Sequence, residues 1–306
     1  MSDLTRHMDD YLRLRRALGF KLKREGRELP QLVAYVEAAG ATTLSIDLSV
    51  AWARLPQGVQ PLYRANRLGS ARGFARYLQT IDATTQVPPC GIWSSPRTRP
   101  VPYLYSDQDV ERLLVASRQL RPPLRAATYE TLFGLIAVSG MRIGEARRLQ
   151  RNDVDLTKGV LTIREAKFDR SRLVPLHASA TDALRSYAVV RDQHFPSPTA
   201  KTFFVSTVGM GLHYSGVHAT FKTLCASADL GSPAARPRIH DLRHSFAVRT
   251  LIELTRSGID IHAHIAALSI YLGHVNPAGT YWYLSAAPEL MELAAGHLNR
   301  RIGGRP

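Results

Sequence analysis

A proline-rich segment near residue 95 interrupts the sequence and limits what the chain can fold into. Proline fixes the backbone φ angle and lacks an N–H donor, so this segment cannot form a regular helix. Its composition favours an extended, semi-rigid linker. With 306 residues the chain is long enough for two domains, and we predict domains at 1–87 and 104–306 joined by a linker at 88–103. Five prolines lie within fifteen residues there: Pro88, Pro89, Pro96, Pro100 and Pro102.

Residues 1–87 have the pattern of a small helical bundle. Apolar residues recur every three to four positions over 9–18, 29–39 and 47–55, which predicts three amphipathic helices. A fourth helix is expected over 61–78, a segment rich in arginine.

Residues 104–306 mix helical and β patterns. Ser106 and Asp109 match a capping box that starts a helix, and 126–138 is apolar enough to be a buried helix. We therefore predict a mostly α fold with a small β-sheet or hairpin, in which the second domain is α+β. Further elements are expected at 159–165 and 172–177 (a hairpin), 181–191 (a helix), 202–206 (a short strand) and from 214 onward (mostly helix).

The chain is strongly basic, with 40 Lys and Arg against 25 Asp and Glu, a net charge of +15 and an isoelectric point near 10.2. Such a charge is the usual footprint of a nucleic-acid-binding protein, although it can also serve solubility. No apolar run reaches the ~18 residues of a membrane span, and the N-terminus has no secretory pattern. Two cysteines, Cys90 and Cys225, exclude a disulfide framework and a four-cysteine zinc site. We expect a cytoplasmic, nucleoid-associated protein with no membrane partner.

The basic residues between 51 and 100 are concentrated on the expected arginine helix. This stretch holds seven basic residues against a single acid, Asp82. Spacings of three to five residues place four of the arginines largely on one face, which favours contact with DNA phosphates over a merely solvated face. The candidate DNA-binding residues are Arg64, Arg67, Arg72 and Arg76 on the helix and Arg97 and Arg99 in the linker.

Four places in the second domain carry side chains suited to phosphate chemistry. A glycine turn delivers Arg142 to a helix start, where its guanidinium and the free amides can face an anion. His240 and Arg243 are three residues apart on an expected helix and so share a face. The other two places are Lys167, near the tip of the expected hairpin, and Leu272-Gly273-His274, followed nine residues later by Tyr283. Taken singly, each of the four places has an ordinary structural explanation.

Together and in this order, these residues resemble the motifs of the tyrosine recombinases, also called the phage integrase family. The family pattern is an Arg within Gly-x-Arg-x-x-Glu, a hairpin Lys, His-x-x-Arg, Leu-Gly-His, and a Tyr nine residues after that His. The resemblance is strong over 106–285 and only architectural over the first hundred residues. Gly140, Arg142 and Glu145 match the first motif, and the run at 173–176 lies at the family's distance after the lysine.

Two positions near the tyrosine depart from the family pattern. A frequent Thr-Thr pair is Gly279-Thr280 here, and Ser285 stands where a histidine is often found. Neither change removes a catalytic group. Tyr271 and Tyr281 are competing nucleophile candidates, but only Tyr283 has the family spacing.

The resemblance implies an N-terminal core-binding domain and a C-terminal catalytic domain that act on double-stranded DNA recombination sites. Tyr283 would attack the scissile phosphate and form a 3′-phosphotyrosyl intermediate, with no metal, ATP or other cofactor. The remaining implied roles are phosphate binding by Arg142, Arg243 and His274, protonation of the leaving oxygen by Lys167, and proton transfer from the tyrosine by His240.

The resemblance also implies self-association on DNA as a tetrameric synapse. Glu145 is expected to orient Arg142 rather than to enter the chemistry. A C-terminal tail helix is expected over 288–299, and it could pack on its own domain or on a neighbouring protomer.

Three other functions share some of these features. A type IB topoisomerase-like enzyme uses similar Arg, Lys, His and Tyr chemistry, and a catalytically inactive relative would keep DNA binding alone. A metal-dependent nuclease would need a ligand cluster. His262 and His264 face differently on an expected helix, and no carboxylate cluster accompanies His240, which argues against a metal site.

Overall fold

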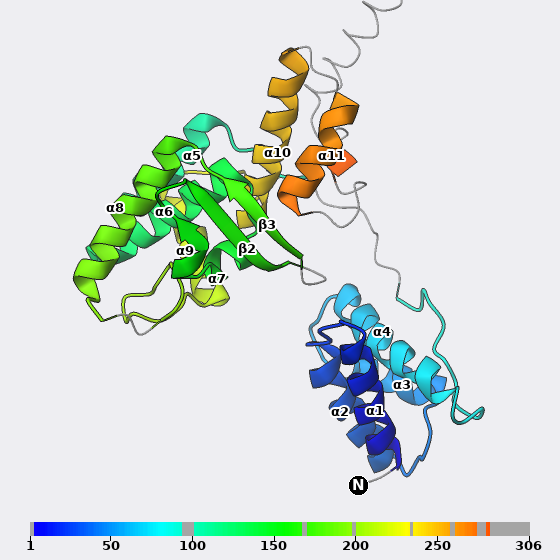
Figure 1. The fold of residues 1–306 in the computed structure, drawn as a ribbon. Helices are drawn as coiled ribbons and strands as arrows, with labels where there is room; N and C mark the ends of the chain where they lie inside the picture. The colour runs from blue at the N-terminus through cyan, green and yellow to red at the C-terminus, as the bar shows by residue number, and fades with distance from the viewer. Residues whose placement is uncertain are drawn as a thin grey trace, which may run out of the picture. The chain divides into compact units, whose positions relative to one another are not determined.

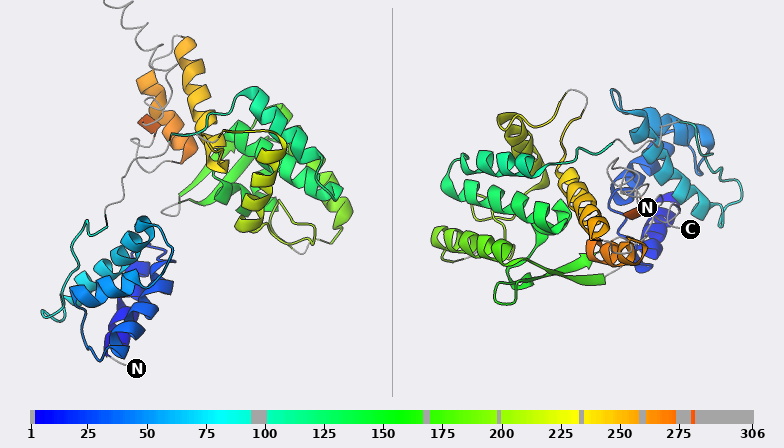
Figure 2. Two further views of the ribbon diagram at one scale, coloured as in Figure 1. Left: turned by 180° about the vertical axis from the view of Figure 1, so that it is seen from behind. Right: turned by 90° about the horizontal axis from the view of Figure 1, so that it is seen from above.

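The computed structural model describes residues 3–93, 101–166, 170–197, 200–232, 235–257, 261–273 and 280–281. The chain divides into two compact units, Met1–Arg99 and Pro100–Pro306, and each is considered by itself (Figures 1 and 2). The boundary between the units lies within 88–103. Among the described residues, no helix combines the length and apolar character needed to cross a bilayer.

Unit 1 is a helical bundle, as the sequence predicted. Its core includes Leu29, Trp52 and Phe74, each at most 1% exposed. The Ser45 hydroxyl accepts a hydrogen bond from the Leu48 amide (3.1 Å) and so caps the third helix. The first helix begins six residues before the predicted start. The helices are α1 (Asp3–Ala17), α2 (Glu25–Ala38), α3 (Ile46–Arg54) and α4 (Pro61–Leu78).

The central helix of unit 2 is the buried α6 (Pro123–Ser139). It packs against α5 (Asp107–Arg118), α8 (Ala178–His194) and α10 (Ile239–Arg256) (Figure 1). Its Leu132 and Phe133 side chains are fully buried. The predicted capping box is confirmed, because Ser106 and Asp109 exchange backbone-to-side-chain hydrogen bonds of 3.0 and 3.1 Å. The other helices are α7 (Ile143–Arg148), the 3-10 turn η1 (Arg151–Asp153), α9 (Tyr214–Ser227) and α11 (Ile261–Leu272).

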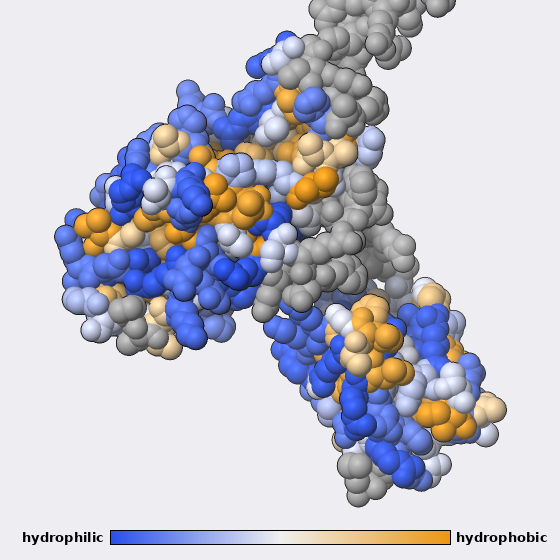
Figure 3. All heavy atoms as spheres, in the orientation of Figure 1, coloured by the Kyte–Doolittle hydropathy of each residue, from blue (hydrophilic) through white to orange (hydrophobic). Residues whose placement is uncertain are grey.

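A three-stranded antiparallel sheet lies beside these helices in the order β1 (Val154–Asp155), β2 (Val160–Ala166) and β3 (Arg170–Pro175). The predicted hairpin strands are thus confirmed. Leu161 pairs with Val174 across the two strands, and both side chains are buried. Leu173, the residue before Val174 on β3, lies on the opposite face of the sheet and is 65% exposed. Figure 3 shows apolar side chains gathered over this sheet on an otherwise largely hydrophilic face. The observed fold class, mostly helical with a small sheet, confirms the prediction.

The prediction of a strand at 202–206 is wrong. This segment forms only isolated bridges, Thr202 with Gln150 and Val205 with Gly211. Its aromatic side chains instead fill the core, with the rings of Phe203 and Phe204 5.6 and 5.2 Å from that of Tyr187. A short apolar run signals burial, but it does not by itself distinguish a ladder strand from a buried loop.

Candidate active site

The turn between α6 and α7 is built on Gly140. Its φ of +61° ends α6 in the left-handed region, where glycine has no steric penalty. A Cβ at this position would lie 2.4 Å from Phe246 Cδ1 and 2.9 Å from Leu272 Cδ2. Close packing therefore leaves no room for a side chain, and the turn brings Arg142 to the start of α7.

Arg142 reaches from α7 to the end of α11. Its Nη1 donates to Glu145 Oε1 (2.8 Å), and its Nη2 donates to the Gly273 carbonyl (2.9 Å). The backbone amide of Arg142 donates to the other Glu145 oxygen, Oε2 (3.1 Å). The side chain keeps 37% of its surface exposed. Its guanidinium is thus fixed on two sides and still accessible.

Arg243, on α10, is only 1% exposed and meets the same segment. Its Nη1 donates to the Gly140 carbonyl and its Nη2 to the Leu272 carbonyl, both at 2.7 Å. Arg142 Nη1 also approaches the Leu272 carbonyl, at 3.4 Å. The structure therefore brings together two of the predicted catalytic arginines, although about a hundred residues separate them.

His240 lies in the first turn of α10, with an exposed edge. Partial burial of the imidazole lowers its pKa, and the positive charges of Arg243 and Arg142 lower it further, against the opposing effect of Asp241. Its ring also meets that of His244 edge-on, with centroids 4.6 Å apart. The neutral form of His240 is therefore favoured near neutral pH, and one helical turn separates it from Arg243 on α10.

Glu145 and Arg172 complete the described cluster. Burial alone would raise the pKa of the Glu145 carboxyl, but hydrogen bonds and charge from Arg172 and Arg142 lower it to about 2. Arg172 is not among the residues predicted from the sequence. A signal was present, because Arg172 is two residues before the buried Val174 and pairs with the buried Ile163, so strand alternation turns its side chain inward.

Three predicted catalytic residues, Lys167, His274 and Tyr283, lie outside the described residues, as do Arg97, Arg99 and the expected tail helix at 288–299. Of the competing tyrosines, Tyr271 stacks on Phe246 with ring centroids 5.7 Å apart, and burial raises its pKa. Tyr281 is 44% exposed.

Comparison with known proteins decides the family, because residues 103–289 match the phage integrase family. The chain belongs to this family. It is 43% identical over 309 residues to y4rB of Sinorhizobium fredii, described as an integrase/recombinase, with 98% of each chain covered. It is 28% identical over 252 residues to tyrosine recombinase XerC of Chlorobaculum parvum, covering 75% of this chain and 70% of that relative.

A solved structure shows the same fold. The Tn1549 transposon integrase in complex with transposon right end DNA matches with a TM-score of 0.67 and 16% identity, over 96% of this chain and 98% of that chain. The resemblance inferred from the motifs is confirmed. The chain belongs to the tyrosine recombinase (phage integrase) family, whose members catalyse DNA cleavage and rejoining.

The arginines of α4 in this integrase-family chain are not equivalent. Arg67 is 5% exposed, with its guanidinium 3.8 Å over the Trp52 ring, so it serves the bundle core and does not fit the predicted phosphate-facing surface. Arg72 donates to the carbonyls of Pro88 and Pro89, both at 2.7 Å. Arg64 donates to the carbonyl of Pro56 in the loop before α4 (3.1 Å), and Arg76 is exposed.

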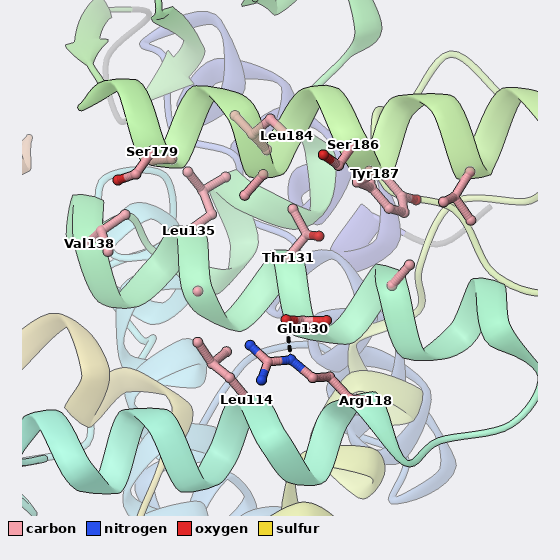
Figure 4. A pocket seen from close by; sticks show the side chains of 15 residues that line it. Leu114, Arg118, Glu130, Thr131, Leu135, Val138, Ser179, Leu184, Ser186 and Tyr187 are labelled. Atoms are coloured by element: carbon pink, nitrogen blue, oxygen red, sulfur yellow. Dashed lines mark hydrogen bonds and ion pairs between the residues drawn. The ribbon is translucent and has the colours of Figure 1, made fainter.

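A groove of about 400 Å³ lies between α5, α6 and α8 of the integrase-family unit (Figure 4). Its walls are mostly apolar, and an ion pair between Arg118 and Glu130 (2.7 Å) lies at its edge. None of the predicted catalytic residues that the structure describes lines it. In the described part of the chain, no group of three His, Cys, Asp or Glu side chains is arranged to hold a metal ion.

Proposed function

We propose that this protein is a site-specific DNA recombinase or integrase that cleaves and rejoins duplex DNA through a 3′-phosphotyrosyl intermediate, with Tyr283 as nucleophile. The observation that carries the proposal is the convergence of Arg142 and Arg243 on the Leu272 carbonyl at the end of α11, with His240 one helical turn from Arg243 on α10. Leu272 and Gly273 end that helix and immediately precede His274 in the sequence. Family membership and motif spacing supply Lys167 and Tyr283.

The arginine cluster suits a phosphodiester in its transition state. The accessible guanidinium of Arg142 can donate paired hydrogen bonds to the non-bridging oxygens as negative charge develops there. Arg243 adds its positive charge, and its direct donation to the phosphate requires the segment that carries the Gly140 and Leu272 carbonyls to shift when DNA binds. With Arg172 the cluster holds three positive charges against the one carboxylate of Glu145, so it attracts an anion. Loss of a donor of this kind typically costs about 3–4 kcal/mol of transition-state stabilisation.

The proposed reaction balances without a cofactor. The phenolate oxygen of Tyr283 bonds to phosphorus as the bond from phosphorus to the 5′ oxygen breaks, and Lys167 gives that oxygen its proton. His240, neutral because its pKa is lowered, accepts the proton of the phenol, and His274 donates a hydrogen bond to the phosphate. Rejoining reverses these steps with a 5′-hydroxyl as nucleophile, because the phosphotyrosyl bond keeps the energy of the diester.

We further propose that the partners are duplex recombination sites and three more copies of this chain. Exchange between two duplexes requires four strand cleavages. One tyrosine becomes covalently attached at each cleavage, so a complete reaction uses four protomers. The exposed Arg76 on α4, together with Arg64, Arg97 and Arg99, would add phosphate contacts that carry no sequence information.

The test uses a pool of nicked duplexes with randomised sequence around the nick, so that the target site need not be known. Cleavage near the nick releases a short fragment and traps the protein on DNA, which a denaturing gel resolves and sequencing reads. We expect adduct with the wild-type protein and with Tyr281→Phe, and none with Tyr283→Phe. Adduct that persists in Tyr283→Phe would disprove the assignment of the nucleophile.

A further inference from the structure

We propose that Arg172 is a positioning residue for DNA cleavage, which holds Arg142 in place through Glu145 and ties strand β3 to the end of α11. The inference rests on the proposed function and assigns a role to a residue outside the predicted catalytic set.

Arg172 uses three of its donors on two elements. Its Nη2 and Nη1 donate to Glu145 Oε2 and Oε1 (2.7 and 3.2 Å), which is a forked, charge-assisted pair. Its Nε donates to the Tyr271 carbonyl in α11 (2.8 Å). The side chain is only 10% exposed, so solvent screens these bonds little.

Glu145 divides its oxygens evenly between two arginines. Oε1 accepts from Nη1 of Arg142 and from Nη1 of Arg172, and Oε2 accepts from the Arg142 amide and from Nη2 of Arg172. The carboxylate is 8% exposed. Removal of Arg172 therefore leaves each oxygen with one of its two donors, so the carboxylate is held by Arg142 alone and fixes the Arg142 guanidinium less rigidly.

The Arg172 guanidinium also packs directly against Gly273. A Cβ on Gly273 would lie 2.7 Å from Arg172 Nη1 and 3.0 Å from its Cζ, and the glycine has a φ of +67°. Gly273 in turn accepts the hydrogen bond from Arg142 Nη2. Arg172, Glu145, Arg142 and Gly273 thus form a closed ring of contacts.

This ring joins three of the segments that carry predicted catalytic groups. Arg142 immediately precedes α7, His274 follows Gly273, and Lys167 lies three residues before β3, the strand that holds Arg172. Misplacement of a reacting group by about 1 Å can cost about 100-fold in rate. A lysine cannot replace Arg172, because a single ammonium cannot span both Glu145 oxygens and the Tyr271 carbonyl in a fixed fork.

The experiment compares wild type, Arg172→Met, Arg172→Lys and a matched control, Arg185→Met. Arg185 lies on α8, is 52% exposed and pairs with Asp182, so its loss should change nothing measured here. Single-turnover adduct formation at saturating protein gives the cleavage rate, fluorescence anisotropy gives DNA affinity, and thermal unfolding reports folding. Duplexes recovered from the randomised pool with the wild-type protein serve as substrate.

We expect both Arg172 variants to lose about 100-fold in cleavage rate while DNA affinity stays within about threefold. In a double variant, Glu145→Gln with Arg172→Met, the loss should be no larger than in the worse single variant, because both act through Arg142. A purely structural role would instead lower the melting temperature together with the rate, which the thermal unfolding of each variant reports.

Two outcomes distinguish the inference from the proposed function. A wild-type protein that forms no adduct overturns the proposed function and the inference with it. A wild-type protein that forms adduct, with an Arg172→Lys variant that is folded and equally fast, overturns the inference alone. If Arg172→Met does not fold, Arg172→Lys retains the charge and decides the question.

Discussion

Replacement of Glu145 by glutamine tests the electrostatics of the cluster most directly. Glutamine keeps the shape of the side chain but removes its charge and one acceptor. The carboxyl pKa is lowered from 4.5 to about 2 in the folded protein. That difference corresponds to about 3 kcal/mol of folding free energy at pH 7, because the folded state favours the carboxylate by this amount. Glu145→Gln should lose most of it.

The same shift predicts how the loss depends on pH. A group with a lowered folded-state pKa contributes its full stability above the unfolded value, here 4.5, and loses it as pH falls toward 2. At pH 3 the contribution of Glu145 should fall to about 1.4 kcal/mol. The difference in unfolding free energy between wild type and Glu145→Gln should therefore shrink by about half between pH 7 and pH 3.

Urea unfolding followed by far-ultraviolet circular dichroism at several pH values measures this difference. Glu130→Gln is the matched control, since Glu130 has one ion pair, to Arg118 (2.7 Å), and is 32% exposed. Its loss should be below about 1 kcal/mol. A Glu145→Gln variant within about 0.5 kcal/mol of wild type at pH 7, or a difference that does not change with pH, would refute the reasoning.

Three further predictions concern other parts of the molecule. Gly140→Ala should lower the melting temperature in a thermal scan and abolish adduct formation, because its Cβ would lie 2.4 Å from Phe246 at a φ of +61°; an unchanged melting temperature would contradict this packing. Arg67→Ala should destabilise unit 1, because the guanidinium stacked on Trp52 is buried. Arg76→Ala should instead reduce DNA affinity and lower the dependence of log K on log salt concentration by about 1 in an anisotropy titration. Unchanged DNA affinity in Arg76→Ala would exclude Arg76 from the DNA-binding surface. Because the pKa of His240 lies below the ordinary 6.5, the acidic limb of the cleavage-rate profile should have its midpoint below pH 6.5; a midpoint above pH 6.5 would argue against His240 as the proton acceptor.

Local patterns predicted the elements, and the resemblance to the family's motifs predicted which residues form the cluster. The hairpin strands, the capping box at Ser106 and the i to i+3 relation of His240 and Arg243 follow from short-range rules that the fold respects. These rules did not predict the three-dimensional surroundings of individual side chains. Arg67 has the spacing of a surface arginine, yet it lies over Trp52, a partner from α3 that no periodicity within α4 could indicate.

Arg172 was missed for the same reason. A charged residue on the inner face of a strand requires a buried counter-charge, and that counter-charge, Glu145, lies 27 residues earlier in another element. The strand at 202–206 failed because apolar content reports burial and not hydrogen-bond partners. Contacts between residues far apart in the sequence therefore determine the parts of the site that local sequence patterns do not predict.

The bonds from Arg72 to the carbonyls of Pro88 and Pro89 shorten the tether between the two units. Trp93 still packs on the core of unit 1, and in unit 2 the Tyr105 amide is already held by Ser245 Oγ (2.7 Å). About twelve residues remain between these anchors, with a maximum span of about 40 Å. If both units bind DNA, as proposed, such a tether would keep the second unit at a millimolar effective concentration once the first has bound. Two weak, sequence-tolerant contacts would then act as one bivalent clamp.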